Sequence, residues 1–422
     1  MINQLSQLNL RQSGVKEISG ATRPRADYIS AVVRRLGALL GLIGAVVMLL
    51  LAPLLSRITF GDSSHTLPFM LLSVVVFFNA LTSGEQAILQ ANCMFRRLAR
   101  ASLWGGVVAT AISIVLIRFF GFNAIVPSII IFSAVIALSY FIKGSKVTAS
   151  RIPAGEFLAA STPILRLGVY MTAATFMTLL AQYAFLAWMR GRVGDGGVGL
   201  YQSGYTIINQ YVSLVFTAMA VEFFPRVSSV AASRVRTSLF VRHEMSMLLW
   251  GLLGAIVLFV NLVPFIIRLL YDSTFLPVTG YVTIASVGTV LKAVSFVMAF
   301  VILARGDGKI YLITESLSAV LYLCFYMIGY RMYGLQGIGF AYVAWYAAYV
   351  VSVMSVYKFR YRLGGIRRPL LFSLAVFIVV AAQAALCLCG LYLAATIVSC
   401  IVVPFSGTMF YFLFLKRRTL KE

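Results

Sequence analysis

Long apolar stretches separated by short polar segments make up almost the whole chain. A helix needs about 20 apolar residues to cross the hydrocarbon core of a bilayer, and about twelve stretches reach that length. They cover residues 36–58, 67–90, 101–118, 123–142, 164–188, 200–222, 245–267, 279–303, 310–330, 337–357, 369–391 and 395–415. The pattern therefore predicts an all-α polytopic membrane protein with no sizeable extramembrane domain.

The apolar pattern also repeats after about 210 residues, which is the kind of internal symmetry that repeat architectures leave in a sequence. Residues 41–47 (GLIGAVV) match residues 251–257 (GLLGAIV). Further matches follow in the same order: Asp62-Ser63 with Asp272-Ser273, Leu67-Pro68 with Leu276-Pro277, and Gly121 with Gly334. Two related hydrophobic halves are typical of transporters, whose substrate site lies at the interface of the repeats.

Basic residues fall mainly in alternate loops. One side holds those of residues 1–35 and of the loops at 96–100, 143–151, 226–242, 305–309, 358–368 and 416–421. The other side holds only Arg57, Arg118, Arg190, Arg192, Arg268 and Arg331. Because basic loops stay in the cytoplasm, both termini are predicted to be cytoplasmic. The net charge of +23 is then explained by topology and by contact with anionic phospholipid headgroups. It does not indicate nucleic-acid binding, since scattered loops form no continuous groove.

The repeat divides the chain into four predicted segments. Residues 1–35 form a cytoplasmic amphipathic segment, 36–150 a first bundle of four helices, and 151–360 a second bundle of six; residues 361–422 add two helices and a basic cytoplasmic tail. Spans one to four match spans seven to ten, so the counterparts of spans five and six would precede Met1, with residues 1–15 as their remainder. Alternatively, the first bundle simply has four helices.

The fifth and sixth spans carry polar residues at helical spacing. In residues 200–222 these are Tyr201, Tyr205, Asn209 and Ser213, and Gln202, Thr206 and Gln210 form the adjacent row. In residues 164–188 they are Thr172, Thr175, Thr178 and Gln182. Residues four apart share one helix face, and a polar face is costly against lipid. These faces predict a water-filled cavity that binds substrate, although interhelical hydrogen bonds would also explain them.

Ionisable residues within the spans are further candidates. Lys292 lies near the middle of residues 279–303, where an ammonium usually faces a cavity, an anionic ligand or a carboxylate. Its alternative is a structural ion pair, for instance with Glu85. Glu85, Glu222 and Glu315 lie toward the cytoplasmic ends of their spans and are weak candidates for binding a coupling proton or cation.

No catalytic or cofactor motif accompanies these residues. The sequence has no phosphate-binding glycine loop and no nucleophile–base pair, and neither its two histidines nor its five cysteines have metal-ligand spacing. An enzyme, a bound cofactor and a metal site are therefore not expected.

Four short motifs resemble those of one transporter family. They are residues 198–201 (VGLY), 223–228 (FFPRVS), 271–277 (YDSTFLP) and 303–306 (LARG). Together they make the chain similar to the polysaccharide flippases, the O-antigen flippase-like lipopolysaccharide biosynthesis proteins of the multidrug/oligosaccharidyl-lipid/polysaccharide exporter superfamily. The resemblance covers roughly residues 10–360.

The resemblance implies two helical bundles around a central, often cationic cavity and an alternating-access mechanism. The substrate would be an undecaprenyl-diphosphate-linked oligosaccharide, moved across the bacterial inner membrane for O-antigen, capsule or exopolysaccharide synthesis. Lys292 would attract the diphosphate. A polysaccharide polymerase and the export machinery are possible partners, and a monomer is expected.

Three other functions stay open. A drug/cation antiporter of the same superfamily would need a compact acidic cluster, whereas the carboxylates here are dispersed. A membrane polysaccharide polymerase or glycosyltransferase would need catalytic residues in large external loops, but the external loops are short. An inactive, truncated flippase is the third alternative.

Overall fold

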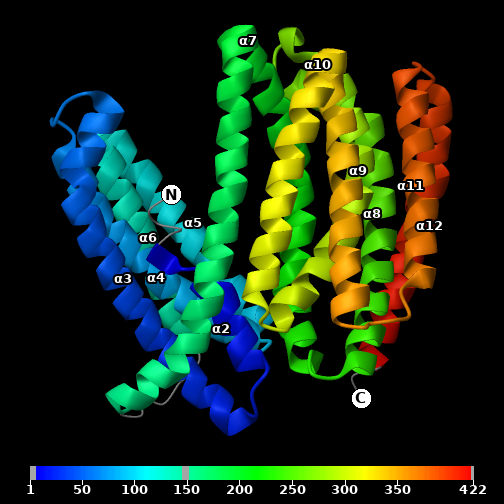
Figure 1. The fold of residues 1–422 in the computed structure, drawn as a ribbon. Coiled ribbons are helices and arrows are strands. Elements are labelled where there is room, and N and C mark those ends of the chain that lie inside the picture. Colours follow the sequence, from blue (N-terminus) through cyan, green and yellow to red (C-terminus); the bar gives the residue numbers. More distant parts are fainter. Residues whose placement is uncertain (1–5, 145–151, 420–422) are drawn as a thin grey trace. The chain divides into compact units, whose positions relative to one another are not determined.

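The computed structural model describes residues 6–144 and 152–419, and this part of the chain is helical without any strand. Lys146, Arg151 and Lys421, which the charge pattern assigns to the cytoplasmic side, lie outside the described residues. The chain forms two compact units (Figure 1). Unit 1 comprises Met1–Ala173, Phe224–Ser229 and Gly306–Gly308, and unit 2 comprises Ala174–Phe223, Val230–Arg305 and Lys309–Glu422.

Unit 1 is built on four long helices and one short one. Its elements are α2 (Leu10–Ser19), α3 (Arg23–Phe60), α4 (Thr66–Ala91), α5 (Phe95–Phe120), the 3₁₀ turn η1 (Gly121–Ala124), α6 (Ile125–Lys143) and the first part of α7 (Ala154–Val230). Helix α4 is the centre of this unit, because it packs against α2, α3 and α6. Helix α2, which lies in the predicted amphipathic segment of residues 1–35, buries Leu10, Val15 and Ile18.

Unit 2 is organised around α9. Its elements are the part of α7 over Ala174–Phe223, then α8 (Arg234–Leu270), the 3₁₀ turn η2 (Ser273–Phe275), α9 (Val278–Ala304), α10 (Gly308–Ser355), the π-helical turn η3 (Val356–Arg360), α11 (Arg367–Leu388) and α12 (Tyr392–Thr419). The most apolar window of α9 is 83% buried, and this helix packs against α8 and α11. Helices α11 and α12 therefore belong to unit 2 rather than standing apart.

The internal repeat is present in the backbone as well as in the sequence. Helices α3 and α8 each contain one matching interior proline, Pro53 and Pro264. Gly121 follows α5 with φ 58° and ψ −139°, and Gly334 bends α10 with φ 57° and ψ −136°. An L-residue rarely adopts a positive φ of this kind, so glycine fixes the same turn in both halves. The two halves thus share a proline position and a backbone turn as well as the sequence motif.

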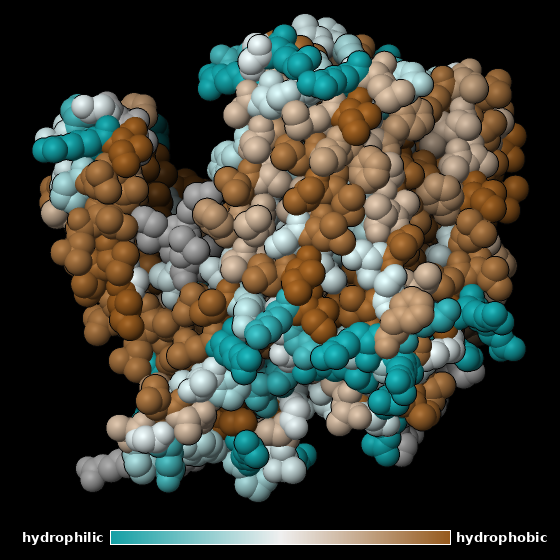
Figure 2. Space-filling view, in the orientation of Figure 1, coloured by the Kyte–Doolittle hydropathy of each residue, from teal (hydrophilic) through white to brown (hydrophobic). Residues whose placement is uncertain are grey.

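The described residues contain nine helical stretches that are long and apolar enough to cross a membrane. Three of them are 48, 57 and 53 residues long, and each contains a sharp bend, at Gly121, Gly194 or Gly334. At 1.5 Å per residue, about 20 residues span 30 Å, so each of the three is long enough for two crossings. Each bend lies in or beside the gap between two predicted spans. Figure 2 shows hydrophobic side chains along the helices and hydrophilic ones toward their ends, as a bilayer requires.

The repeated glycine motif packs differently in the two units. In α3, a Cβ on Gly41 would lie 3.0 Å from the carbonyl oxygen of Phe77 in α4. In α8, a Cβ on Gly254 would lie 2.2 Å from the hydroxyl oxygen of Ser406 in α12. The missing side chain lets a neighbouring helix come close in both cases, but the neighbour is α4 in unit 1 and α12 in unit 2.

Candidate functional site

Unit 2 contains a polar and aromatic cavity of about 210 Å³ between the two limbs of α7 and the two limbs of α10. Its walls are Thr178, Gln182, Tyr205, Asn209, Glu315, Ser318, Ala319, Tyr322, Tyr342, Trp345, Tyr346 and Tyr349. The volume is below the 300–1,000 Å³ of typical small-molecule sites, so it suits one part of a larger ligand or an ion with its water.

Helix periodicity explains why these residues meet. Thr178 and Gln182 are four apart on the first limb of α7, and Tyr205 and Asn209 are four apart on the second. The chain turns back between them at Gly194, which has φ 65°. Helix α10 repeats this arrangement with its own bend at Tyr333 and Gly334. Two bent helices thus contribute four polar faces to one space.

Hydrogen bonds tie the walls of the cavity together. The Gln182 amide Nε2 donates to the Tyr205 hydroxyl oxygen over 3.0 Å, which joins the two limbs of α7. The Trp345 indole Nε1 donates to the Ser318 carbonyl oxygen over 2.9 Å, and the Tyr349 hydroxyl donates to the Glu315 carboxylate. The last two bonds join the limbs of α10. The cavity is therefore held in shape by polar contacts that lipid could not provide.

Lys292 of α9 lies beside this cavity. Its ammonium donates to the Asn209 amide oxygen Oδ1 over 3.2 Å and lies 5.5 Å from the Phe216 ring centre and 5.8 Å from that of Tyr346. None of the ion pairs found among the described residues involves Lys292. An amide oxygen and two aromatic faces thus hold this positive charge, which is consistent with a role toward an anion.

A layer of aromatic side chains closes one end of the cavity. Phe185, Tyr281 and Tyr326 are fully buried, and Tyr201 is 3% exposed. The Tyr201 and Tyr322 hydroxyl oxygens are 3.0 Å apart, and the Phe185 ring lies 5.3 Å from that of Tyr326. On both bent helices these residues lie one turn closer to the bend than the cavity walls do. The layer therefore separates the cavity from the bends of α7 and α10.

The remaining polar residues predicted on α7 lie elsewhere. Tyr201 belongs to the aromatic layer, and half-buried Thr175 is not among the cavity walls. Ser213 is exposed, together with the row formed by Gln202, Thr206 and Gln210. This helix therefore has two polar faces, one toward the cavity and one toward the surface of the unit.

The three candidate carboxylates also have different surroundings. Glu85 is 1% exposed and forms an ion pair with Arg34, whose Nη2 lies 2.9 Å from Glu85 Oε2. Glu85 thus has its partner within unit 1, Arg34 of α3, whereas Lys292 binds Asn209 within unit 2. Glu315 lines the polar cavity, and Glu222 lines a second one.

The contribution of α10 to the cavity is absent from the sequence prediction, Glu315 excepted. Ser318 and Tyr322 on its first limb, and Trp345 and Tyr349 on its second, follow the same spacing of three or four residues as the predicted rows. The spacing of these residues in the sequence could therefore have predicted a second pair of cavity faces. Most of these positions are aromatic, however, and aromatic residues at helical spacing usually indicate ordinary packing.

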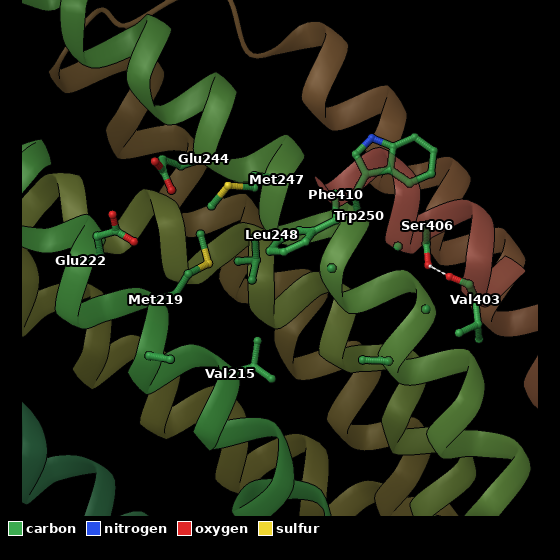
Figure 3. A pocket seen from close by; sticks show the side chains of 15 residues that line it. Val215, Met219, Glu222, Glu244, Met247, Leu248, Trp250, Val403, Ser406 and Phe410 are labelled. Carbon is green, nitrogen blue, oxygen red and sulfur yellow. Dashed lines mark hydrogen bonds between the residues drawn. The ribbon is translucent and has the colours of Figure 1, made fainter. Parts of the chain in front are cut away.

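The second cavity, of about 540 Å³, lies between α7, α8 and α12 and is mainly apolar (Figure 3). Its lining residues are Val215, Ala218, Met219, Glu222, Glu244, Met247, Leu248, Trp250, Gly251, Gly254, Ala255, Val403, Ser406, Gly407 and Phe410. Figure 3 shows Glu222 and Glu244 together at one end, beside Met219 and Met247. A hydrocarbon chain suits the apolar part, whereas an anionic headgroup does not suit the acidic end.

Metal-ligating side chains do not gather in the part of the chain that the structure describes. No three His, Cys, Asp or Glu residues come close enough there to hold a metal ion. The walls of the two cavities offer hydrogen bonds, aromatic faces, single charges and apolar surface.

Comparison with known proteins assigns the chain to one sequence family and finds solved structures with a similar fold. Residues 10–280 match the family described as "Polysaccharide biosynthesis protein". The fold is similar to that of a mutant MATE transporter from Vibrio cholerae, with 14% identity, 85% of each chain covered and a TM-score of 0.67. It is also similar to the lipid II flippase MurJ in an inward closed conformation (15% identity, 98% of this chain and 94% of that chain, TM-score 0.58). A MOP superfamily transporter from Pyrococcus furiosus matches as well (14% identity, 90% and 86%, TM-score 0.64). No curated protein matches.

Proposed function

Because the chain belongs to the polysaccharide biosynthesis protein family, we propose that it flips an undecaprenyl-diphosphate-linked oligosaccharide across the bacterial inner membrane. The substrate enters from the cytoplasmic leaflet and leaves in the periplasmic leaflet by alternating access, and both chain termini are cytoplasmic. The product serves the synthesis of O-antigen, capsule or exopolysaccharide. The observation that carries this proposal is the polar and aromatic cavity of unit 2.

The walls of this cavity have the chemistry that a sugar needs. Tyr322, Trp345 and Tyr346 supply ring surface, while the Gln182 and Asn209 amides supply both donors and acceptors. A sugar has the same combination of apolar CH surface and hydroxyl groups. Because the cavity holds only about 210 Å³, it accepts one sugar unit at a time rather than a whole oligosaccharide.

The rest of the substrate is assigned to neighbouring features of unit 2. The ammonium of Lys292 attracts the diphosphate, and Asn209 orients this ammonium. The exposed polar face with Gln202, Thr206 and Ser213 gives hydroxyl-rich sugars a path that does not touch lipid. The apolar cavity between α7, α8 and α12 receives part of the polyprenyl chain.

A flipping assay tests the proposal. The full chain is reconstituted into vesicles with a fluorescent polyprenyl-diphosphate oligosaccharide in both leaflets. A membrane-impermeant quenching reagent is added outside, and the fraction of the fluorescent lipid that becomes accessible to it is measured over time. Gln182→Leu and Asn209→Leu are expected to slow flipping at least tenfold. Thr162→Val is the matched control, because Thr162 lies on α7 in unit 1 and its hydroxyl bonds only within its own helix, to Leu158. Wild-type protein that gives no flipping above empty vesicles contradicts the proposal.

A second candidate function is cation-driven drug export. It is favoured by one observation, the Glu315 carboxylate in the polar cavity, bonded to Tyr349. If the protein is such an antiporter, lipophilic cations will be transported and will compete with protons or sodium. Transport of the lipid-linked oligosaccharide without any transport of lipophilic cations excludes this alternative.

A further inference from the structure

Two arginines, Arg192 and Arg331, lie close to one tryptophan at the bends of unit 2. Arg190 and Arg192 precede the bend of α7 at Gly194, and Arg331 precedes the bend of α10. The Arg192 guanidinium carbon lies 4.7 Å from the centre of the Trp188 ring, and that of Arg331 lies 5.7 Å from the same centre. Figure 1 shows the tips of α7 and α10 together at one end of this unit, and Figure 2 shows hydrophilic side chains over those tips.

This cluster has an excess of positive charge. The Arg190 guanidinium forms an ion pair of 2.7 Å with Asp195, so these two charges compensate each other. Arg192 and Arg331 are exposed and take part in none of the ion pairs found among the described residues. Their charges lie within roughly one Debye length of each other, about 10 Å at 0.1 M salt, so they act on an anion together.

The positive charge of Arg192 and Arg331 lies on the side of the protein where basic residues are rare. The charge pattern assigns these bends to the periplasmic side, where the chain has few basic residues. Half of the six arginines that the charge pattern assigns to that side nevertheless lie beside these two bends. Tryptophan concentrates at the level of the lipid headgroups, and Trp188 ends a predicted span, so we expect it near the depth of the phosphate groups.

The contact with Trp188 leaves the arginines able to bind phosphate. A guanidinium over an aromatic ring uses its flat face for that contact, and its N–H groups point outward in the plane. Those N–H groups match phosphate oxygens in a two-pronged geometry, which a lysine cannot reproduce. Both arginines are also exposed, so their donors stay available to a ligand.

We propose that Trp188, Arg192 and Arg331 form a binding site for lipid phosphate in the periplasmic leaflet. Two guanidinium groups favour a diphosphate over a single phosphate, since both charges then act on one ligand. The aromatic layer with Phe185 and Tyr326 separates this site from the polar cavity. The site therefore binds the diphosphate of the lipid-linked oligosaccharide after its crossing, and in that respect it rests on the proposed function and on the predicted topology.

Lipid binding by the purified full chain tests this site without any transport. Native mass spectrometry measures binding of undecaprenyl diphosphate and, separately, of phosphatidylglycerol. The double variant R192Q/R331Q is expected to bind undecaprenyl diphosphate about tenfold more weakly. Arg268→Gln is the matched control, because Arg268 is another exposed periplasmic arginine of unit 2 outside the cluster. The variant R192K/R331K, which keeps the charge but loses the two-pronged geometry, is expected to recover only part of the binding.

The two lipids distinguish the source of the phosphate. A loss confined to undecaprenyl diphosphate supports a product site, and an equal loss for phosphatidylglycerol supports a general lipid-phosphate site. Binding of both lipids at the wild-type level by R192Q/R331Q overturns the proposal, as does an equal loss in Arg268→Gln. Because binding is measured without flipping, failure of this site leaves the flipping proposal untouched, and failure of flipping leaves this binding result standing.

Discussion

Replacing Lys292 with methionine separates a functional lysine from a structural one. Methionine keeps the unbranched, flexible shape of the side chain and removes only the ammonium. The ammonium makes one hydrogen bond of 3.2 Å, to Asn209, and lies over the Phe216 and Tyr346 rings. A hydrogen bond to a charged group contributes about 1.5–3 kcal/mol, and each cation–ring contact adds roughly 0.5–2 kcal/mol.

The opposing term is the cost of keeping this charge away from water. For an ion inside a protein this cost is about several kcal/mol, and no carboxylate partner offsets it here among the described residues. The two terms are of similar size, so Lys292→Met is expected to change the free energy of unfolding by less than about 1 kcal/mol. That corresponds to an apparent Tm shift within about 4 °C. Flipping of the lipid-linked oligosaccharide should nevertheless fall at least tenfold.

Fluorescence-detected thermal unfolding and the vesicle flipping assay check the two halves of this prediction. Lys309→Met is the control, because Lys309 is exposed and lies in the first turn of α10, away from the cavity walls. A fall in Tm well beyond 4 °C shows that Lys292 is structural. Unchanged flipping removes it from the substrate path.

Five other variants test the remaining interpretations. Glu85→Gln removes the charge of a buried carboxylate whose partner Arg34 is partly exposed, and it is expected to destabilise the protein by about 1–3 kcal/mol, seen as a fall in Tm. Gly121→Ala and Gly334→Ala should each destabilise the protein by about 1–3 kcal/mol through backbone strain. The two losses should be similar, because neither added Cβ would meet another atom within 4 Å. A clear difference in Tm between the two variants refutes the equivalence of the two turns. Glu315→Gln should remove any dependence of transport on pH if this carboxylate carries a coupling proton, and an unaltered pH profile excludes that role. Gly407→Leu fills open space in the apolar cavity and is expected to raise the KM for substrates with a long polyprenyl chain; an unchanged KM speaks against tail binding there.

The sequence by itself determined the helices, the two related halves and part of the cavity. Apolar length specifies a spanning helix because lipid cannot satisfy backbone groups, and glycine specifies the turns at Gly121 and Gly334 because other residues avoid their φ. Helix periodicity places Gln182 with Thr178, and Tyr205 with Asn209, on shared faces. All four line the cavity of unit 2.

Only the tertiary structure decided which faces meet. Local spacing is the same for a packing residue and a cavity residue, so the walls supplied by α10 emerged only from its packing against α7. Lys292 binds Asn209, and Glu85 binds Arg34. The same glycine motif faces α4 in one unit and α12 in the other. Partner choice depends on the shape and charge of whole helix surfaces, which residues distant in the chain create together.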